Sequence, residues 1–458
     1  MGWIRLRSPR RKSLVELLAL AIVLGILFHY FHSPHPEYDR PAARSKKQAG
    51  KALACSALPG AKDVVVALKT STAELEERLP VHFDTTLLCY PNYILFSEWK
   101  ETYRGHAILD VLDSVDQTIK GSHPDFELWR RLQKGGPDAL EDEELWASEG
   151  TTKRLDKWKW LPMIQKTFAE QPDRKWYVFL ETDTYIFWSN LLTWLETLDS
   201  EKPHYIGARK ETHELSYALA GAGFVLSHAA AKAAVDVYEK NKMIWEGLTK
   251  SSPYGDEIVG GMLEAAQAPL NPAWPIFQRH KPAEMDYTTQ SDGKRLWCYP
   301  SVSYHGLVPA EIAELWKFEQ QWLMDKPSTI IRHSDVFKSY IMPRLLIRSG
   351  RVDDWDNFSG NFTEGTAAET VDVCREMCVA RMECVQFAFS NGTCEFSSIP
   401  RMGTHRRGVR SRWMLARAQD FADKMEACTG EETWLARNVT VERTTSAAAA
   451  APTTRVPT

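Results

Sequence analysis

The sequence predicts an α/β protein with a mainly parallel sheet, preceded by a transmembrane helix and followed by a small module held by disulfide bonds. Short apolar segments alternate with longer helical patterns between residues 60 and 325, which is typical of a parallel sheet covered by helices. An apolar run follows basic residues near the N-terminus. Four of the eight cysteines lie within residues 374–394, which predicts a separate disulfide-rich module.

The composition indicates an ordered globular protein. Of the 458 residues, 44% are hydrophobic and 17 are tryptophans, which argues against a disordered chain. This length allows one large domain and a smaller one. The formal net charge is only −4, so the charge balance predicts no nucleic-acid partner.

The N-terminal segment predicts the compartment. Residues 1–12 are rich in Arg and should form a cytosolic tail, and the apolar part of residues 13–31 spans about 18 positions, enough to cross a bilayer as a helix. Residues 32–54 are rich in Pro, Ala and charge and suit a flexible stem. A cleaved signal peptide is the alternative, although no small-x-small pattern follows Phe31. Both interpretations send the rest of the chain into the secretory pathway.

The elements of the α/β domain, residues 55–350, follow from their periodicity. Buried strands are predicted at residues 63–70, 85–98, 176–180 and 204–208, and helices at 157–171, 190–198 and 256–267. Residues 220–241 read as a Gly-rich turn, a strand and an Ala-rich helix. The acidic stretch 135–150 is predicted to be a solvated insertion or loop.

The C-terminal part differs in amino-acid composition from the preceding residues. Residues 351–436 hold closely spaced cysteines, and residues 437–458 form a low-complexity tail that is predicted to be disordered. Four N-glycosylation sequons occur, all after position 356, which agrees with a lumenal location. They are at Asn357, Asn361, Asn391 and Asn438.

Two carboxylates follow a strongly apolar strand at "WYVFLETDTYIFW". Glu181 and Asp183 are two positions apart and should point to the same side of the strand end. Ligands of open α/β sheets bind outside the carboxyl ends of the strands. Oxygen ligands at that place suit Mn²⁺ or Mg²⁺, which also binds substrate phosphates. The alternative is a pair of solvated loop carboxylates, with Thr182 and Thr184 making turn hydrogen bonds.

This stretch resembles the "DDDTY" signature of glycosyltransferase family 31, which includes fringe and the core 1 β1,3-galactosyltransferase. Further segments are similar to that family in the same order, and the resemblance covers roughly residues 60–325. They are "KWKWLPM" (157–163), "AGAGFVLS" (220–227), "GDEIVGGMLE" (255–264), "VSYHGL" (302–307) and "ELWKFEQ" (314–320). The resemblance implies a GT-A fold, with a Rossmann-like mixed sheet flanked by helices.

The resemblance also implies an activity and a location. It predicts an inverting, β1,3-forming transferase that takes a sugar from a UDP-sugar donor to a glycan or glycoprotein acceptor. Such an enzyme would be a single-pass type II protein of the Golgi membrane, with its catalytic domain in the lumen.

The implied metal ligands are Asp183, Glu181 and His305, around Mn²⁺ or Mg²⁺. Asp183 matches the last acid of the family signature, and His305 matches its metal-binding histidine. Glu181 stands where the family usually has Asp, so its coordination, direct or through water, stays open. A buried structural histidine is the alternative for His305.

The implied catalytic base is Glu257, with Asp256 as the rival. An inverting transferase needs one carboxylate to take the proton of the acceptor hydroxyl. Glu257 matches the second acid of the family motif, but Glu again replaces Asp there. Without the resemblance, both residues are explained as acids favoured at a helix N-terminus.

The remaining predicted site residues contact the substrates. Gly221, Ala222 and Gly223 would let the backbone approach a bound sugar closely. Thr182 and Glu181 are assigned to substrate binding, and Lys157 to the diphosphate, although such lysines are more often solvated.

The C-terminal module resembles an apple/PAN domain, a class that binds proteins or carbohydrate. Disulfide bonds are expected among Cys374, Cys378, Cys384 and Cys394, with a connectivity that the spacing does not determine. Cys55 is expected to pair with Cys89, which leaves Cys298 and Cys428. A metal site is the competing interpretation of the cysteine cluster.

Two other functions remain open at this stage. One is a catalytically inactive, membrane-anchored carbohydrate-binding or adhesion protein, because the two Asp-to-Glu departures displace a metal or a base. The other is a secreted carbohydrate-binding protein.

Overall fold

The computed structural model describes residues 55–141, 151–212, 215–327, 329–348, 350–360, 365–425, 427–430 and 434. These residues belong to one compact unit. The predicted tail, anchor and stem (1–54) and the C-terminal tail (437–458) lie outside the described residues. None of the helices in the described part is long and apolar enough to span a bilayer.

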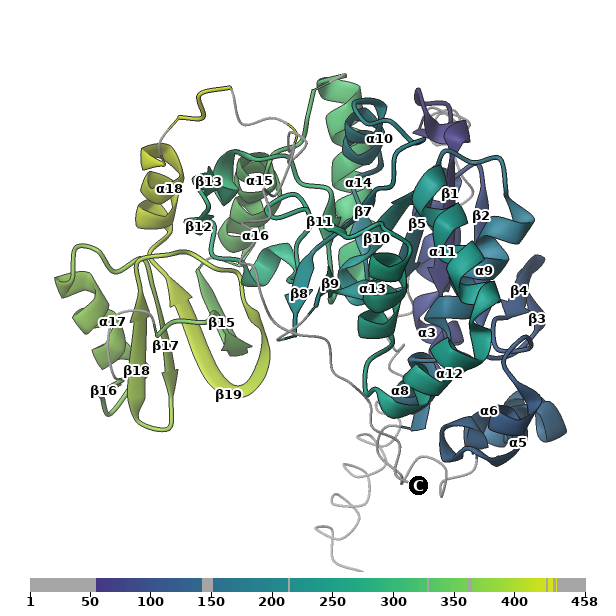
Figure 1. Ribbon diagram of the computed structural model, residues 1–458. Coiled ribbons are helices and arrows are strands. Elements are labelled where there is room, and N and C mark those ends of the chain that lie inside the picture. The colour runs from purple at the N-terminus through teal and green to yellow at the C-terminus, as the bar shows by residue number, and fades with distance from the viewer. Residues whose placement is uncertain are drawn as a thin grey trace, which may run out of the picture. The chain divides into compact units, whose positions relative to one another are not determined.

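A mixed eight-stranded sheet forms the centre of the α/β part (Figure 1). Its strand order is β11-β7-β10-β5-β1-β2-β4-β3. Strand β10 runs antiparallel to its neighbours β5 and β7, and the edge strand β3 runs antiparallel to β4. The other neighbouring pairs are parallel. The bounds are β1 (Val64–Lys69), β2 (Tyr93–Ser97), β3 (Glu101–Tyr103), β4 (His106–Asp110), β5 (Trp176–Glu181), β7 (Tyr205–Gly207), β10 (Phe224–Ser227) and β11 (Leu270–Pro272).

Helices cover both faces of this sheet. Along β1, Val65 and Ala67 point into one apolar core and Val64, Val66 and Leu68 point into the other, as the two-residue period of a strand requires. The first core is completed by α9 (Trp160–Glu170), α11 (His228–Lys240), α12 (Lys242–Ser251) and α13 (Gly255–Ala265). The second is completed by α3 (Leu75–Arg78), α4 (Pro80–Asp84) and α10 (Trp188–Glu196).

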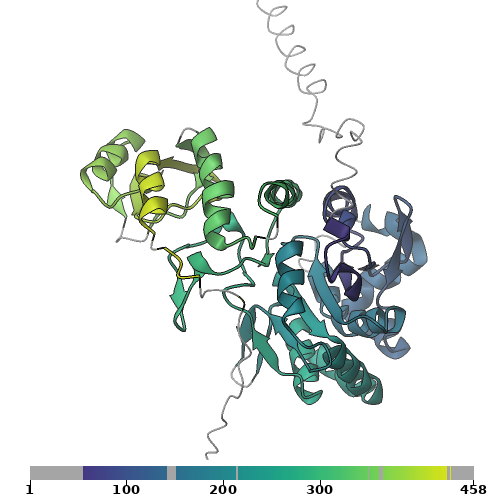
Figure 2. The same cartoon turned by 90° about the horizontal axis from the view of Figure 1, so that it is seen from above.

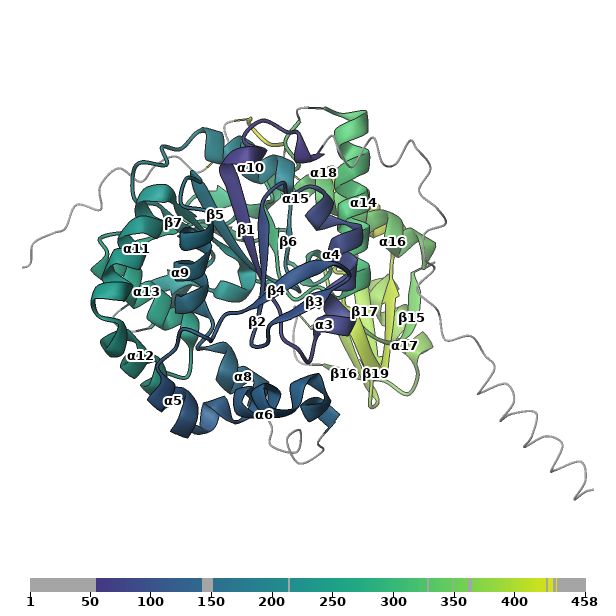
Figure 3. The same cartoon turned by 90° about the vertical axis from the view of Figure 1, so that its right-hand side faces the viewer.

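The figures show these layers directly. In Figure 3, helices α9, α11, α12 and α13 lie on one side of the central strands, and α4 and α14 (Pro309–Asp325) lie on the other. In Figure 2 the teal helices of residues 228–265 form a layer along one face of the sheet. The predicted α/β class with a sheet flanked by helices is therefore confirmed.

The strand predicted at residues 85–98 is only partly correct. Strand β2 begins at Tyr93, and Thr86–Leu88 form a turn of 3₁₀ helix. The hydroxyl of Thr85 donates to the carbonyl of Val81, which caps α4 instead of leaving the backbone extended. The helices predicted at 157–171, 190–198 and 256–267 are present within a few residues of their expected ends.

Smaller elements complete the α/β part. Strands pair as β6 (Tyr185–Ile186) with β14 (Ser303–Tyr304), β8 (Arg209–Glu211) with β9 (Ser216–Ala218), and β12 (Gln290–Ser291) with β13 (Lys294–Arg295). The remaining α-helices are α5 (Gln117–Ser122), α6 (Glu127–Gly135), α8 (Thr151–Asp156), α15 (His333–Val336) and α16 (Met342–Ile347). Further 3₁₀ turns are Ala61–Asp63, Pro124–Phe126, Gly136–Glu141, Ala220–Ala222, Pro282–Glu284 and Leu296–Cys298, and Phe337–Ile341 form a π-helical turn.

The C-terminal module is an antiparallel five-stranded sheet with two helices. Its strand order is β15-β19-β17-β18-β16. The bounds are β15 (Arg351–Asp356), β16 (Thr366–Ala367), β17 (Gln386–Ser390), β18 (Thr393–Ser397), β19 (Thr404–Trp413), α17 (Val371–Ala380) and α18 (Leu415–Lys424). Helix α17 is tied to β18 by the Cys374–Cys394 bond and to the following loop by Cys378–Cys384.

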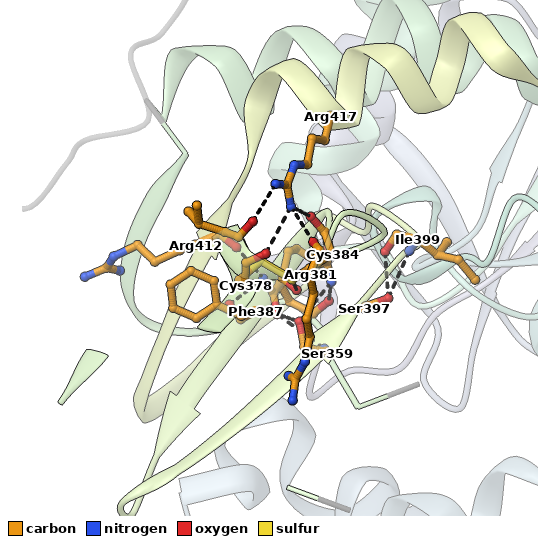
Figure 4. The surroundings of a disulfide bond; sticks show 12 residues. Ser359, Cys378, Arg381, Cys384, Phe387, Ser397, Ile399, Arg412 and Arg417 are labelled. Atoms are coloured by element: carbon orange, nitrogen blue, oxygen red, sulfur yellow. Dashed lines mark hydrogen bonds between the residues drawn. A yellow bond between two sulfur atoms is a disulfide. The ribbon is translucent and has the colours of Figure 1, made fainter. Parts of the chain in front are cut away.

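All eight cysteines are paired. Cys55 bonds to Cys89, which confirms the expected pair, and the two remaining cysteines, Cys298 and Cys428, bond to each other. No thiols remain for a metal site. Arg417 strengthens the small Cys378–Cys384 loop, because its guanidinium donates to the carbonyls of Cys378, Arg381 and Cys384 (Figure 4). Four disulfides are typical of an oxidising, secretory-pathway compartment.

A third apolar core joins the module to the preceding residues. It contains Trp297 and Ile312 of the α/β part together with Trp413 and Ala418 of the module. Arg401 of the module also forms an ion pair with Asp286 at 3.1 Å. The Cys298–Cys428 bond closes a chain segment of 130 residues across this junction.

The sequons differ in accessibility. Asn357 is fully buried, and its amide donates to the carbonyls of Phe387 and Arg412. Asn391 is exposed in the turn between β17 and β18. In the folded protein Asn391, but not Asn357, is therefore accessible to an enzyme that attaches N-linked glycans. Asn361 and Asn438 lie outside the described residues.

The buried His333 makes stability depend on pH. Its Nε2 donates to the carbonyl of Pro275 and its Nδ1 accepts from Tyr304, both at 2.8 Å, and burial lowers the pKa of His333 to about 4. The unfolded chain binds this proton near pH 6.5, so stability is present above that pH and is lost as the pH falls toward 4. We expect His333 to lower the free energy of unfolding by about 3 kcal/mol over this pH range, as measured by urea unfolding at several pH values.

The control for this prediction is a pair of variants. His333→Gln should show a shallower loss of stability between pH 6.5 and 4 than the unchanged protein, whereas replacing the exposed His280 by Gln should not alter the slope. Parallel pH curves for the protein and His333→Gln would contradict the assignment.

Candidate functional site

The candidate site begins at the carboxyl end of β5, a central strand of the sheet. The apolar part of this strand is buried between the two cores, and Glu181 is its last residue. Asp183 lies in the turn that follows, which is closed by a hydrogen bond from the Thr184 amide to the Glu181 carbonyl. This is the edge at which open α/β sheets bind ligands.

The pairing of β6 with β14 brings His305 to this turn. Tyr185 lies opposite Tyr304 in the antiparallel register, and the amide of Leu307 donates to the carbonyl of Asp183 at 2.9 Å. As a result, Nδ1 of His305 lies 3.2 Å from Oδ1 of Asp183. Two predicted site residues more than a hundred positions apart are therefore in contact.

The Gly-rich segment forms the wall beside this pair. The Thr184 hydroxyl donates to the carbonyl of Gly221, and the Ser303 hydroxyl donates to that of Ala222. A Cβ atom on Gly221 would lie 2.6 Å from the imidazole of His305. Gly223 adopts φ +77°, a left-handed conformation that favours glycine.

If the predicted ion binds between Asp183 and His305, replacing Gly221 by Ala should weaken its binding about tenfold with little loss of stability. The added methyl group would push the imidazole of His305 away from Asp183, and one ligand displaced by an ångström loses most of its contribution. Mn²⁺ titration followed by electron paramagnetic resonance measures this. Gly247→Ala, in α12 with no atom within 4 Å of the added carbon, is the control; equal weakening in both variants would contradict the prediction.

The two carboxylates that the sequence placed together have different environments. Glu181 forms an ion pair with the buried Lys69 at 3.0 Å, whereas Asp183 faces His305. Lys69 also pairs with Asp156 at 3.0 Å, and Asp156 with Lys159 at 2.8 Å. Burial alone would lower the pKa of Lys69, but the charges of Asp156 and Glu181 outweigh it and raise this pKa.

These residues form a charge network at the ends of β1, β2 and β5, in which the lysines are buried and Asp156 and Glu181 are partly exposed. Its members are Lys69, Glu98, Asp156, Lys159 and Glu181. Lys159 forms an ion pair with Glu98 at 2.7 Å, and both side chains are 1% exposed. Three acids and two bases leave one net negative charge on this network. Within this network, Lys69 is the cation that pairs with Glu181.

Two residues near the turn carried no signal in the sequence. Nε2 of His82 lies 2.9 Å from the carbonyl of Thr182, and its Nδ1 lies 2.9 Å from the Thr86 hydroxyl. Burial lowers the pKa of His82 to about 4, so the neutral ring holds the turn in place. Nη1 of Arg78 lies 4.0 Å from Oδ2 of Asp183. Both residues come from short helices without a recognisable pattern.

The protonation of His305 depends on its neighbour. Burial would lower the pKa of His305, but the hydrogen bond and charge of Asp183 raise it overall. A cation bound between the two side chains would displace this proton, since only neutral imidazole coordinates a metal.

The acid pair at the start of α13 is linked to the same site. Asp256 is 9% exposed and accepts a hydrogen bond from the backbone of Ala220, the residue next to Gly221. Its Oδ2 also lies 3.8 Å from Nζ of Lys210. Burial raises the pKa of Asp256 against the opposing effect of Lys210. The partly buried Glu257 accepts from the Ser252 hydroxyl at 3.0 Å.

Lys157 is engaged within the protein. Its Nζ forms an ion pair with Asp125 at 3.0 Å and donates to the carbonyl of Ser252 at 3.0 Å. The assignment of this side chain to a diphosphate stays a prediction. Its backbone packs against Gly255, directly before the acid pair, where no larger residue would fit.

The donor atoms fit a divalent ion only in part. Asp183 and His305 supply one oxygen and one nitrogen, a set that suits Mn²⁺ when substrate phosphates and water complete the coordination. No group of three or more His, Cys, Asp or Glu side chains suited to a metal occurs among the described residues. A protein-only cage is thus not formed there.

The fold and the site define a class of protein. The chain is an α/β protein with a disulfide-rich antiparallel module, and its polar site lies at the carboxyl edge of a mixed sheet. No protein-family model matches the sequence.

Proposed function

We propose that the protein is a metal-dependent glycosyltransferase of GT-A fold, similar to glycosyltransferase family 31. It transfers a sugar from a UDP-sugar to a hydroxyl group of a glycan or glycoprotein, with inversion and formation of a β1,3 bond. The observation that carries this proposal is the 3.2 Å contact between Asp183 and His305 at the end of β5. Two residues that the family resemblance assigns to one ion lie in contact where an α/β sheet binds its ligands.

Asp183 and His305 would hold the ion, with the donor diphosphate completing its ligands. Bound Mn²⁺ or Mg²⁺ would supply a Lewis acid that neutralises the charge on the departing UDP. Arg78, next to Asp183, contributes a further positive charge on this side of the site. Gly221 and Gly223 keep the wall thin enough for the sugar to approach the backbone.

A carboxylate at the start of α13 takes the acceptor proton. The acceptor oxygen forms a bond to the anomeric carbon, the bond from that carbon to the UDP oxygen breaks, and the proton passes to the base. We favour Asp256 for this role over Glu257, because its raised pKa suits a general base and its link through Ala220 joins it to Gly221. Glu257 remains the alternative that the family motif implies.

Glu181 and Thr182 stabilise the turn that carries the donor site. Glu181 keeps Lys69 paired, and the carbonyl of Thr182 is fixed by His82, so both hold the turn that carries Asp183. In this role Glu181 acts on the substrate through the turn.

The proposed location follows from the N-terminal sequence and the disulfides. A cytosolic tail (1–12), a membrane anchor (13–31) and a stem (32–54) would place the α/β domain and an apple/PAN-like module in the Golgi lumen as a type II protein.

A second candidate is an inactive, membrane-anchored carbohydrate-binding protein. The observation that favours it is the pairing of Glu181 with Lys69, which leaves two of the three assigned metal ligands available.

Thermal unfolding with and without metal separates these two functions. UDP together with Mn²⁺ should raise the melting temperature by several degrees, since a ligand at 100 times its Kd adds about 2.7 kcal/mol. EDTA should remove this shift, and a panel of UDP-sugars should show slow Mn²⁺-dependent hydrolysis of one of them. An inactive carbohydrate-binding protein would show neither the metal-dependent shift nor the hydrolysis.

A further inference from the structure

The C-terminal sheet carries arginines on the face that α17 partly covers. Strand β19 alternates between buried Ser411 and Trp413 on one face and, on the other, the exposed Arg410 and the partly buried Arg412. In the register of the sheet, Arg412 lies directly opposite Arg351 of β15 and opposite Phe387 of β17. Residues opposite each other in an antiparallel sheet share a face.

Helix α17 covers only the β17–β18 half of this face. It is fastened there by the Cys374–Cys394 bond, and Phe387 beneath it is fully buried. The half formed by β15 and β19 is left open beside the helix. A cavity of 590 Å³ lies at this place, lined by Arg351, Arg375 and Arg412 and closed by Arg417 at the start of α18.

The lining is strongly basic. It contains four arginines and one acid, Asp372. Two like charges directly opposite each other, as Arg351 and Arg412 are, destabilise an antiparallel pair. Features that break a rule of local stability are expected at functional positions.

Two of the four arginines are already satisfied by the fold. Arg412 pairs with Asp353 at 3.0 Å, and Arg417 donates to backbone carbonyls of the Cys378–Cys384 loop (Figure 4). Arg351 and Arg375 are exposed, and their guanidinium groups make no hydrogen bond or ion pair within the described part of the chain. These two side chains are free to bind a ligand.

We propose that this cavity binds the carboxylate or sulfate group of an acidic oligosaccharide. Guanidinium groups form paired hydrogen bonds to such planar or tetrahedral anions. The volume lies within the range of small-ligand pockets and suits one or two sugar rings. A local concave site does not suit the extended backbone of a nucleic acid or a flat membrane. The disulfides place the module in a compartment where acidic sugars are displayed.

This site is independent of the proposed transferase activity, because none of its residues belongs to the candidate active site. Binding by isothermal titration calorimetry on the whole protein tests it. The probes are 3′-sialyllactose for a carboxylate, lactose 3′-sulfate for a sulfate, and lactose as the neutral reference.

At least one acidic probe should bind and lactose should not. Arg351→Ala and Arg375→Ala should each weaken that binding about tenfold, since a charge-assisted hydrogen bond is lost. Arg375→Lys should retain part of it. Arg407→Ala removes the same charge from an exposed position on β19 outside the cavity and should change binding less than twofold.

The two acidic probes identify the source of the anion, and binding of either supports the proposal. Absence of binding by both probes to the folded protein would overturn it. Equal weakening of binding by Arg407→Ala would also overturn the proposal, because the probe would then be attracted by the overall positive charge of the module and not by the cavity. Binding to phosphatidylserine vesicles without binding to either sugar would replace it with a lipid surface.

Discussion

Asp183→Asn and His305→Gln are each expected to lower kcat/KM for sugar transfer by about 10³-fold. Each change removes one of the two side chains that we assign to the ion, and a metal contributes several kcal/mol of transition-state stabilisation at 1.36 kcal/mol per tenfold. Both variants should also bind Mn²⁺ more weakly in the absence of donor. Mn²⁺ titration and UDP release with a matched UDP-sugar measure the two effects.

Glu181→Gln is the matched control for that prediction. Glu181 neutralises the buried Lys69, so its replacement should destabilise the fold more than it weakens metal binding. We expect a lower urea midpoint with Mn²⁺ affinity within about threefold of the unchanged protein, since Asp183 and His305 are both unchanged. A loss of Mn²⁺ affinity equal to that of Asp183→Asn would make Glu181 a direct ligand instead.

Asp256→Asn is expected to lower kcat by 10²- to 10⁴-fold, roughly the contribution of a general base, while donor affinity stays unchanged. Asp256 is the more buried of the two acids and lies against Ala220. Glu257→Gln, which changes the adjacent acid in the same way, should have the smaller effect. A larger loss in Glu257→Gln would transfer the base role to that residue.

The pH profile gives a second measure of the same assignment. Because burial raises the pKa of Asp256, its carboxylate takes up a proton at a higher pH than an exposed aspartate does. As the pH is lowered, kcat/KM should therefore begin to fall at a higher pH than an exposed aspartate would cause. This acid limb should be absent from the residual activity of Asp256→Asn. An unchanged limb in that variant would show that another group titrates.

The regular elements of the α/β part were predictable because their signals are local. The run Val64–Lys69 is apolar throughout, as a strand buried on both faces must be, and the Ala-rich segment after Ser227 is helical. The segment after Thr85 was not predictable in this way. Its apolar residues read as a strand, but the disulfide of Cys89 and the cap from Thr85 turn it into 3₁₀ helix.

Two of the predicted site residues, Asp183 and His305, are in contact, whereas Glu181 has a partner that the sequence did not indicate. Asp183 and His305 were assigned to one ion, and the register of β6 against β14 brings them into contact. The two-residue spacing predicted that Glu181 and Asp183 point to the same side, although Glu181 points to Lys69 at the end of the neighbouring parallel strand. A two-residue spacing fixes the side of a strand, and the neighbouring strand decides the partner.

Sequence alone determined the alternation of strands and helices and the cysteine-rich module, because these depend on neighbours within a few positions. The tertiary structure decided the disulfide connectivity, the partner of each carboxylate and the arginine-lined cavity beside α17. The physical reason is that these features arise from strand registers that join residues tens to hundreds of positions apart. No local pattern encodes that distance.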